Sequence, residues 1–432
     1  MCASIKLNVR RNQIRDVMIS KKVDNGQYAF NVLGPLNTLL KIFSLNCNLQ
    51  INTSLDNFCI LFKYALTVTV LGVINFFTLY YKVINVYSQI NASIKFTDLV
   101  QMVFDYFQYL VDVYNAYKYG RNVSIEYYKQ YGNIDKILGV TNYPAIKKRI
   151  MKSIVFFLFS WFITSACDFA AWVLSFGWLT PIMYSVAYIF LLIKILTTLD
   201  LSAHAMQIEC RLRSICDLLQ HKYASLEPLP GVESDLLNNL NWFYSDACSR
   251  VNKLLTKKNL IIKPLCSSDH EVKWLCRCYL MLIEQSTFIN NMFGIRFLLN
   301  SLSLLIDMIR FLNLAVRMLI GSQHTTYDAG YFPAVCSLLR LLMCVVILVN
   351  LVDNCEKVHR QTDNILNIAD HILINRQPDK ELRDTVTELR DLIRSRPIYF
   401  NIANFFRLNY SMLLSVASVV VTYTIILLQT IN

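Results

Sequence analysis

The stretch from Ile150 to Leu199 decides the fold class. It reads IMKSIVFFLFSWFITSACDFAAWVL over 150–174, then a short SFGW connection, then LTPIMYSVAYIFLLIKILTTL over 179–199. Each apolar run is long enough for one helix to cross the hydrocarbon core of a bilayer, which takes about 20 residues. The connection between them leaves room only for a reversal of the chain. Two antiparallel membrane-spanning helices are therefore expected here.

The composition extends this expectation to the whole chain. Hydrophobic residues make up 55% of the 432 residues, charged residues only 17%, and the mean hydropathy is +0.38. An ordinary soluble domain carries about 25% charged residues. With 11 Gly and 9 Pro, the chain also has too few turn formers for β-rich structure or disordered linkers. The composition indicates a helical membrane protein and argues against a soluble enzyme.

Seven segments have the length and hydropathy of membrane-spanning helices. They are 58–81, 97–117, 150–174, 179–199, 288–319, 331–352 and about 402–428. The second is the weakest because three aspartates interrupt it, and the fifth is long enough to extend beyond the bilayer. An eighth apolar stretch, 28–47, contains Asn, Gly, Pro and Lys residues, so we interpret it as an interfacial helix. The predicted fold is an all-α polytopic membrane protein with seven transmembrane helices.

The basic residues orient these spans, because Lys and Arg concentrate in cytoplasmic loops. With the N-terminus inside, the inside segments hold 31 of the 42 basic residues, whereas the outside segments hold two, both within 82–96. The N-terminus is therefore predicted to be cytoplasmic and the C-terminus extracellular. This asymmetry also accounts for the net charge of +12 without nucleic acid as a partner. Of the Asn-X-Ser/Thr sequons, only Asn91 falls in an outside loop, so it is the predicted glycosylation site.

The expected organisation of the chain follows from the spans and their orientation. In order, it comprises a cytoplasmic N-terminal segment with the interfacial helix (1–57), transmembrane helices one to four (58–200), cytoplasmic anchor helices (201–286), transmembrane helices five and six (287–353), further cytoplasmic anchor helices (354–398) and the last transmembrane helix (399–432). Apolar residues at helical spacing continue the fourth and sixth spans beyond the bilayer and form one face of 381–394. The anchor segments are therefore expected to be helical, with a break at Arg396-Pro397.

Several other protein classes lack support in the sequence. G-protein-coupled receptors place the N-terminus outside, and their Asp/Glu-Arg-Tyr and Asn-Pro-x-x-Tyr motifs are absent from the corresponding spans. The two halves of the chain show no internal symmetry of the transporter kind. Phosphate-binding loops, His-Glu-x-x-His and Gly-x-Ser-x-Gly are also absent. Cys276-x-Cys278 lacks a second pair of zinc ligands. We predict no enzyme activity, no cofactor and no metal site.

The C-terminal end carries a family resemblance. The stretch from Thr422 to Thr430 reads TYTIILLQT, which resembles the Thr-Tyr, five hydrophobic residues, Gln-Phe signature of insect gustatory receptors. Residues 407–415 also resemble that family's last helix, and 33–45 resembles its N-terminal segment. Two positions depart from the signature. Thr424 stands where the classical sugar-receptor branch tends to have Glu, and Thr430 stands where Phe is usual.

The resemblance implies a ligand-gated, non-selective cation channel in the plasma membrane. It further implies a homotetramer with a central pore lined by the last helix, a ligand pocket in each subunit among the second to sixth helices, and a cytoplasmic bundle that joins the subunits. Two alternatives stay open: a subunit that conducts only with a partner gustatory receptor, and a metabotropic receptor. The ligand is expected to be a small organic tastant. Thr424 favours a plant secondary or bitter compound, with a fructose-like sugar as the alternative.

The last helix suits a pore wall. Ser415, Ser418, Thr422, Ile426 and Gln429 fall on one stripe at helical spacing, and small or hydroxylated residues can face water. In this interpretation Ile426 forms a dewetting constriction, Gln429 forms a ring of amides near the outer mouth, and Thr422 and Thr430 complete the pore and gate. The alternative is helix–helix packing, in which the hydroxyls bond back to carbonyls of their own helix.

Polar residues inside the spans supply the candidate ligand pocket, because such residues are costly in a membrane. Asp98, Asp105 and Asp112 recur every seven residues and so share one face of the second span. Aromatic walls with a few convergent polar groups are typical of small-molecule sites. The candidates in the outer half of the spans are Asp98, Asp105, Asp168, Trp172, Tyr184, Tyr188, Asp307, Arg310, Asn313, Phe332 and Cys336. The alternative is that Asp and Arg only pair to hold the bundle, for example Asp307 with Arg310 or Arg317.

Overall fold

The computed structural model describes residues 32–46, 54–88, 92–120, 124–139, 143–226, 269–321, 330–403 and 406–429. The helices, in chain order, are α3 (Gly34–Ile42), α4 (Ser54–Tyr81), the π-helical turn η1 (Lys82–Val86), α5 (Ala92–Gly120), α6 (Ser124–Leu138), α7 (Tyr143–Phe176), α8 (Leu179–Ser225), α10 (Asp269–Ile320), α11 (Phe332–Asn375), α12 (Lys380–Ser395) and α13 (Tyr410–Gln429). Two short antiparallel strands, β1 (Asn401–Ile402) and β2 (Phe406–Arg407), precede α13. The prediction of an all-α fold is confirmed.

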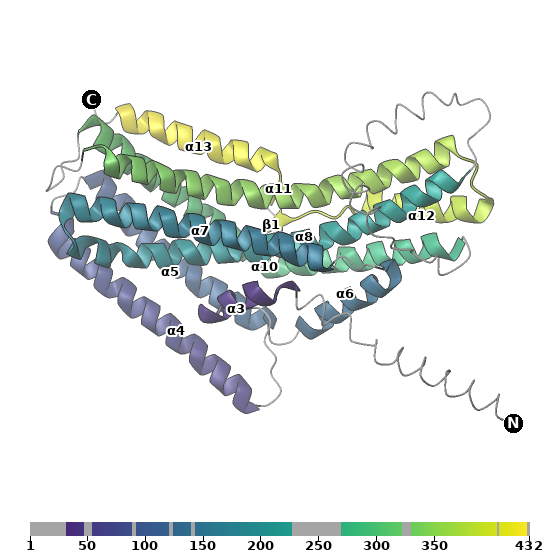
Figure 1. Ribbon diagram of the computed structural model, residues 1–432, viewed down its shortest axis with the longest axis horizontal. Helices are drawn as coiled ribbons and strands as arrows, with labels where there is room; N and C mark the ends of the chain where they lie inside the picture. Colours follow the sequence, from purple (N-terminus) through teal and green to yellow (C-terminus); the bar gives the residue numbers. More distant parts are fainter. Residues whose placement is uncertain are drawn as a thin grey trace, which may run out of the picture.

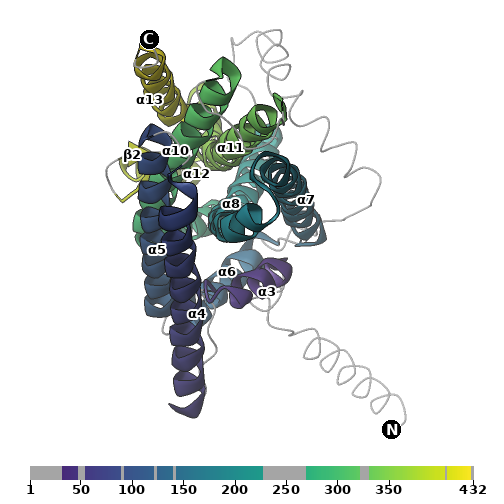
Figure 2. The same ribbon diagram turned by 90° about the vertical axis from the view of Figure 1, so that its left-hand side faces the viewer.

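The long helices α7, α8, α10 and α11 run side by side along the length of the molecule (Figure 1). Viewed along that axis, α8 lies in the middle of the bundle and α4, α7 and α13 lie at its periphery (Figure 2). Helix α7 turns into α8 at Gly177, whose φ of 84° is a conformation that glycine adopts without strain. We call this end of the bundle the connection end, and the opposite end, which holds α12, the extension end.

Five helices are long and apolar enough to cross a membrane: Phe58–Val86, Tyr143–Ser175, Leu179–Ala224, Val272–Ile320 and Phe332–Asn375. A shorter apolar helix covers Tyr410–Ile426. Helix α5 carries the second predicted span but also its three aspartates, which lower its hydropathy. Each of the seven predicted spans corresponds to one helix. The last of these helices begins at Tyr410 rather than at about Ile402, because the β1–β2 hairpin occupies the start of that segment.

Buried apolar residues of the spans and of α3 form one core. At the extension end, α8, α10 and α11 continue as unbroken helices and pack with α12 around a second apolar core. The four apolar residues of α12 recur every three or four positions and are almost wholly buried: Leu382, Val386, Leu389 and Ile393. The charged residues of α12 lie on its outer face, so burial of this stripe holds the helix in place. Helix α12 ends at Ser395, just before Pro397, where the following proline disfavours helical backbone.

Helix α6 is held to α8 by buried polar contacts. Arg211 Nη2 lies 2.8 Å from Asp135 Oδ2, and both side chains are buried. The Tyr127 hydroxyl lies 2.7 Å from that of Tyr131 and 3.1 Å from His204 Nδ1. Burial raises the pKa of Tyr131 to about 12, so this phenol stays protonated and can act as a hydrogen-bond donor at neutral pH. These contacts fix the short helix between the two apolar cores.

The predicted interfacial stretch 28–47 forms α3 within the part that the structure describes. Leu36 and Leu40 of α3 are fully buried, whereas Lys41 and Ile42 are exposed. The Ser44 hydroxyl lies 2.8 Å from Thr67 Oγ1 of α4, and the Lys63 ammonium of α4 donates to the Lys41 carbonyl. Helix α3 therefore packs against the bundle as a short amphipathic helix.

Candidate functional site

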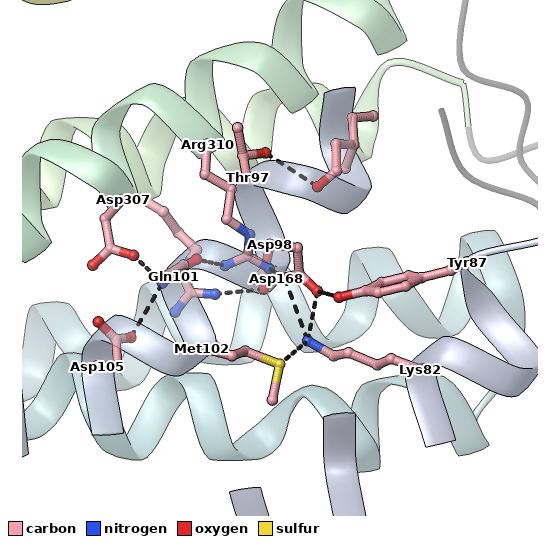
Figure 3. A network of polar contacts seen from close by, with 12 residues as sticks. Lys82, Tyr87, Thr97, Asp98, Gln101, Met102, Asp105, Asp168, Asp307 and Arg310 are labelled. Atoms are coloured by element: carbon pink, nitrogen blue, oxygen red, sulfur yellow. Dashed lines mark hydrogen bonds and ion pairs between the residues drawn. The ribbon is translucent and has the colours of Figure 1, made fainter. Parts of the chain in front are cut away.

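Three aspartates of α5 form a buried ladder of ion pairs in the middle of the bundle. Asp98 occupies the step nearest the connection end, and Figure 3 shows its surroundings. Its Oδ2 atom lies 3.0 Å from Lys82 Nζ, and its Oδ1 atom lies 2.8 Å from Arg310 Nη2. The Tyr87 hydroxyl also donates to Oδ2 over 2.8 Å. One carboxylate thus joins η1, α5 and α10, and two cations compensate its charge.

The second and third steps follow at two-turn intervals along α5. At the second step, Lys194 Nζ lies 2.7 Å from Asp105 Oδ1 and 2.5 Å from Asp307 Oδ2. At the third step, Arg296 Nε lies 3.2 Å from Asp112 Oδ1, and both side chains are fully buried. Seven residues advance a helix by about 10 Å, so the three steps occupy successive levels between α5, α8 and α10.

Gln101 connects the first two steps of the ladder. Its amide nitrogen donates to Asp307, and its carbonyl oxygen accepts from Arg310 Nη1 over 2.6 Å (Figure 3). From the sequence, Asp307–Arg310 is one pairing expected to hold the bundle. In the structure Asp307 instead pairs with Lys194, and Arg310 pairs with Asp98, with the glutamine between them. The turn η1 and the helices α5, α8 and α10 are therefore joined by one continuous polar network.

A separate ion pair joins α7 to α11. Arg340 Nη1 lies 2.8 Å from Asp168 Oδ2, which also accepts a 2.9 Å hydrogen bond from the Tyr188 hydroxyl of α8. The Arg340 guanidinium lies 4.6 Å from the centre of the Tyr188 ring, close enough for a cation–π contact. Within the described residues, Arg340 Nε is buried without a hydrogen-bond partner. This guanidinium therefore retains one donor for a further acceptor.

Aromatic rings line the connection end of the network. The Trp172 and Tyr184 rings stack with centroids 4.6 Å apart and an angle of 14° between their planes. Lys82 Nζ lies 3.6 Å from the centre of the Tyr184 ring. Val86, Ile94 and Leu314 are buried with the two rings in one apolar cluster. The connection end of the network is thus bounded by two aromatic rings, and the Lys82 ammonium lies over the face of the Tyr184 ring.

The structure brings most of the predicted pocket residues together. Eight of them lie in the network or against it: Asp98, Asp105, Asp168, Trp172, Tyr184, Tyr188, Asp307 and Arg310. Asn313 donates to Ser93 and accepts from Arg317, and Cys336 donates to the Cys167 carbonyl. Phe332, by contrast, begins α11 and is 40% exposed. Asn91 and Thr430 lie outside the described residues.

Sequence reasoning missed the two lysines of the ladder. Lys82 lies in the predicted outside segment 82–96. The structure instead buries it in η1, a π-helical turn that continues α4. Lys194 lies in the middle of the apolar stretch 179–199, and this position could have identified it as the partner of a buried carboxylate. Arg407 falls within the predicted span 402–428, but it lies exposed in β2, before α13 begins.

The charges of the first two ladder steps and of the Asp168–Arg340 pair balance. Asp98, Asp105, Asp168 and Asp307 face Lys82, Lys194, Arg310 and Arg340. A buried charge is expensive unless it is paired and hydrogen-bonded, and here every member has at least one partner. Such a network can exchange hydrogen bonds with an uncharged polar molecule without leaving a charge uncompensated. A charged molecule would have to displace one of the existing partners.

The predicted pore stripe lies on the exposed side of α13. Ser415, Ser418, Thr422, Ile426 and Gln429 are all exposed in the single chain. The hydroxyls of Ser415 and Thr422 donate to carbonyls four residues earlier, as the packing interpretation requires. The side of α13 that faces α10 and α11 instead carries the partly buried Leu413, Val416 and Val420. The stripe therefore packs against no other part of the described chain.

Helix α10 holds the linker that leads into α13. The Asn290 side-chain amide donates to the Tyr399 carbonyl over 3.0 Å, and its oxygen accepts from the Asn401 backbone N–H over 3.1 Å. One turn further on, Gly294 lies so close to Ala403 that a Cβ atom at this position would come within 3.0 Å of the Ala403 backbone nitrogen. Ala403 itself has a positive φ of 47°. The same helix that carries Asp307 and Arg310 thus fixes the path of the chain into the last span.

Among the described residues, no group of three or more His, Cys, Asp or Glu side chains is placed to hold a metal ion. The acidic residues of the network face lysine or arginine side chains.

Comparison with known proteins places the chain in a family. The family model described as 7tm Chemosensory receptor matches residues 33–431, almost the whole length. This chain belongs to the 7tm chemosensory receptor family. Members of this family are receptors rather than enzymes, and the chain is a multi-pass helical membrane protein. No curated protein sequence matches the receptor.

Solved structures show the same fold. The insect olfactory receptor OR5 from Machilis hrabei in complex with eugenol superposes with a TM-score of 0.54, at 13% sequence identity, over 94% of this chain and 100% of that one. A second structure of the same olfactory receptor gives a TM-score of 0.56 at 11% identity over the same shares of the two chains. At these identities the likeness concerns the fold alone. The chemosensory receptor described here therefore shares the helix arrangement of that olfactory receptor.

Proposed function

We propose that this receptor is a ligand-gated, non-selective cation channel of the gustatory type. Its membership of the chemosensory receptor family and its fold support a receptor role. The observation that carries the proposal is that α10 contacts both the polar network and the linker into α13. A ligand that changes the contacts of α10 at Asp307 and Arg310 can thereby bias the position of the last helix. A two-state pore needs this kind of differential contact.

The proposed ligand site is the connection end of the network. The stacked rings of Trp172 and Tyr184 offer an aromatic wall, and Asp98, Asp168 and Arg310 offer hydrogen-bonding groups beside it. Because the acidic and basic groups balance, the site suits a neutral molecule with several hydrogen-bonding groups. A plant secondary compound of this kind is our first choice of tastant, and a fructose-like sugar is the second.

The proposed pore is formed by α13 around the axis of a homotetramer. The exposed stripe from Ser415 to Gln429 packs against no described part of its own chain, so in this proposal it faces water on that axis. Ile426 forms the narrow apolar constriction, and the Gln429 amides surround the outer mouth with Thr422 and Thr430 in the pore wall. A heteromer with other gustatory receptors uses the same surface.

The proposed orientation puts the extension end in the cytoplasm and the connection end outside the plasma membrane. The helices of the extension end then form the anchor that joins the subunits. The distribution of Lys and Arg supports this orientation. Antibody access to tags at the two termini of the receptor on intact cells measures it directly. Asn91→Gln should abolish the glycan-dependent shift of the receptor on a gel, and a persisting shift would contradict the assignment of the first outside loop.

The deciding experiment is whole-cell recording from cells that express this chain alone. The panel contains neutral plant glucosides, alkaloids and sugars, and surface expression is verified by a tag. A rapid cation current that persists under G-protein blockade supports the channel and identifies the ligand class. A response that disappears with the blockade favours a metabotropic receptor. Silence at verified surface expression contradicts autonomous conduction for the compounds tested, and co-expression with other gustatory receptors then tests the heteromer.

A further inference from the structure

One exposed face of α7 carries three lysines that form no ion pair within the described part of the chain. Lys148 and Lys152 lie one turn apart on this face, Lys147 lies beside it, and all three are exposed. None of them takes part in an ion pair with another described residue. The neighbouring Arg149 differs: its Nη1 atom lies 2.5 Å from Glu209 Oε2, and its Nη2 atom donates to Asn354 Oδ1. The paired arginine is thus used to join helices, whereas the three lysines point away from the bundle.

The same face becomes wholly apolar within one turn. Val155, Phe159 and Phe162 follow at helical spacing and are 59%, 64% and 64% exposed, and Phe156 and Ile163 flank them. Helix α7 lies at the periphery of the bundle (Figure 2). The exposure of these side chains indicates that this face is directed away from the other helices. In a receptor that spans a membrane, exposed aromatic and aliphatic side chains of this kind face lipid. The hydrocarbon boundary therefore falls between Lys152 and Val155.

We propose that Lys147, Lys148 and Lys152 bind the headgroup of an anionic phospholipid. The lysines lie at the level of the headgroups, and the phosphate of a bound lipid supplies the counterion that the described chain does not provide. The acyl chains of the same lipid lie along Val155 and Phe159, so the polar and apolar parts of the face engage one molecule. Long lysine stems allow the ammonium groups to reach the phosphate from the part of α7 just outside the hydrocarbon.

The charge of the site selects anionic over zwitterionic lipid. A zwitterionic headgroup brings its own cation to the surface, which repels the ammonium groups, whereas an anionic headgroup brings net negative charge. Anionic lipids are concentrated in the cytoplasmic leaflet. We therefore place the site in that leaflet. The orientation derived from the basic residues gives the same placement, and Lys147 and Lys148 are among those residues. This inference concerns the outer surface of α7 and is independent of the ligand and pore assignments.

The test uses the purified full-length receptor in mixed micelles that contain dansyl-phosphatidylserine. Energy transfer from receptor tryptophans, including Trp161 of α7, reports lipid binding, and dansyl-phosphatidylcholine provides the reference. The variant is Lys147→Gln/Lys148→Gln/Lys152→Gln. Each of its three substitutions should weaken the binding of phosphatidylserine about fivefold. The binding of phosphatidylcholine should change little. The three positions are exposed, so the variant should fold and elute from a sizing column as the wild type does.

The matched control removes three exposed cations at the extension end: Lys273→Gln/Lys380→Gln/Arg383→Gln. It has the same net charge as the test variant but should bind phosphatidylserine as the wild type does. Equal loss in both triple variants would overturn the proposal, because it would show a general effect of net charge. Unchanged preference for phosphatidylserine in the α7 variant would overturn it directly. Inorganic phosphate and soluble inositol phosphate should compete only weakly, and full competition would assign the lysines to a free anion instead of a lipid.

Discussion

Lys82 Nζ lies 3.0 Å from Asp98 Oδ2 at a point where both side chains are almost completely buried. Lys82 belongs to η1, and the wider π-helical turn directs its ammonium toward α5 and over the Tyr184 ring. π-Helical turns are uncommon and occur often at functional sites. Asp98 also pairs with Arg310, so a single carboxylate holds two cations from different helices. At the connection end, this one side chain therefore joins η1, α5 and α10.

Asp98→Asn should destabilise the receptor strongly. The substitution keeps the size of the side chain but leaves Lys82 and Arg310 facing each other without a negative charge between them. Removing one partner from a buried ion pair costs about 3–5 kcal/mol. The midpoint of thermal unfolding in detergent, together with the yield at the cell surface, measures the effect.

The control for this substitution is Asp363→Asn in α11, where the aspartate is largely exposed and its one ion-pair partner among the described residues is His359. An exposed pair contributes at most about 1 kcal/mol. An equal fall in the unfolding midpoint of the two variants would mean that Asp98 contributes no more to the stability of the bundle than an exposed aspartate does.

The Asp168–Arg340 pair allows stability to be separated from ligand recognition. Asp168→Asn should lower the unfolding temperature because it leaves the Arg340 guanidinium buried without its carboxylate. The double variant Asp168→Leu/Arg340→Met removes both charges and should regain most of that stability, since apolar residues of similar volume can replace a buried ion pair. If the pair contacts the ligand, the double variant should still need at least about tenfold more ligand for half-maximal current. Full recovery of both stability and sensitivity would show that the pair only holds α7 to α11.

The sequence predicts the helices of this molecule and their order because hydropathy and charge are local properties. Seven apolar stretches, the reversal at Gly177 and the seven-residue spacing of Asp98, Asp105 and Asp112 can all be read without tertiary information. They place each predicted span on one helix and the three aspartates on one face of α5. The amphipathic pattern of 381–394 likewise predicts α12 and its buried side.

The partners of those aspartates are not predictable in the same way. Lys82 directly follows a predicted span, so the local pattern assigns it to a loop. In the structure, the π-helical turn rotates it into the bundle. Which cation faces Asp307 depends on how α8 and α10 are aligned, and this alignment is set by packing along the entire length of both helices. The β1–β2 hairpin is also missed, because the contacts that fix it come from Asn290 and Gly294, more than a hundred residues earlier.

Asn290→Ala should reduce the coupling between ligand binding and pore opening. The substitution removes both hydrogen bonds to the linker, each worth about 1 kcal/mol. The maximal ligand-evoked current per surface receptor should fall, while the ligand concentration for half-maximal binding should not change. Asn290→Asp keeps the acceptor for the Asn401 N–H and should have an intermediate effect.

Thr287→Ala is the matched control on the same helix, because Thr287 is exposed and, within the part of the chain that the structure describes, its hydroxyl bonds only to the Ile283 carbonyl of α10. It should conduct as the wild type does. If Asn290→Ala instead weakens ligand binding itself, or leaves the maximal current unchanged, the linker contacts do not transmit the signal.

Gln429→Arg tests the pore directly. Gln429 is exposed near the end of α13, and in the proposed tetramer the substitution places one positive charge per subunit at the outer mouth. A ring of arginines repels cations, so the variant should block cation current or shift its reversal potential toward that of anions. Arg407→Gln serves as the comparison, because it changes an exposed charge in β2, at the other end of the same segment. Current and reversal potential are measured at matched surface expression. Wild-type values in Gln429→Arg would remove α13 from the permeation path, since a new charge inside the pore cannot leave ion flow unaffected.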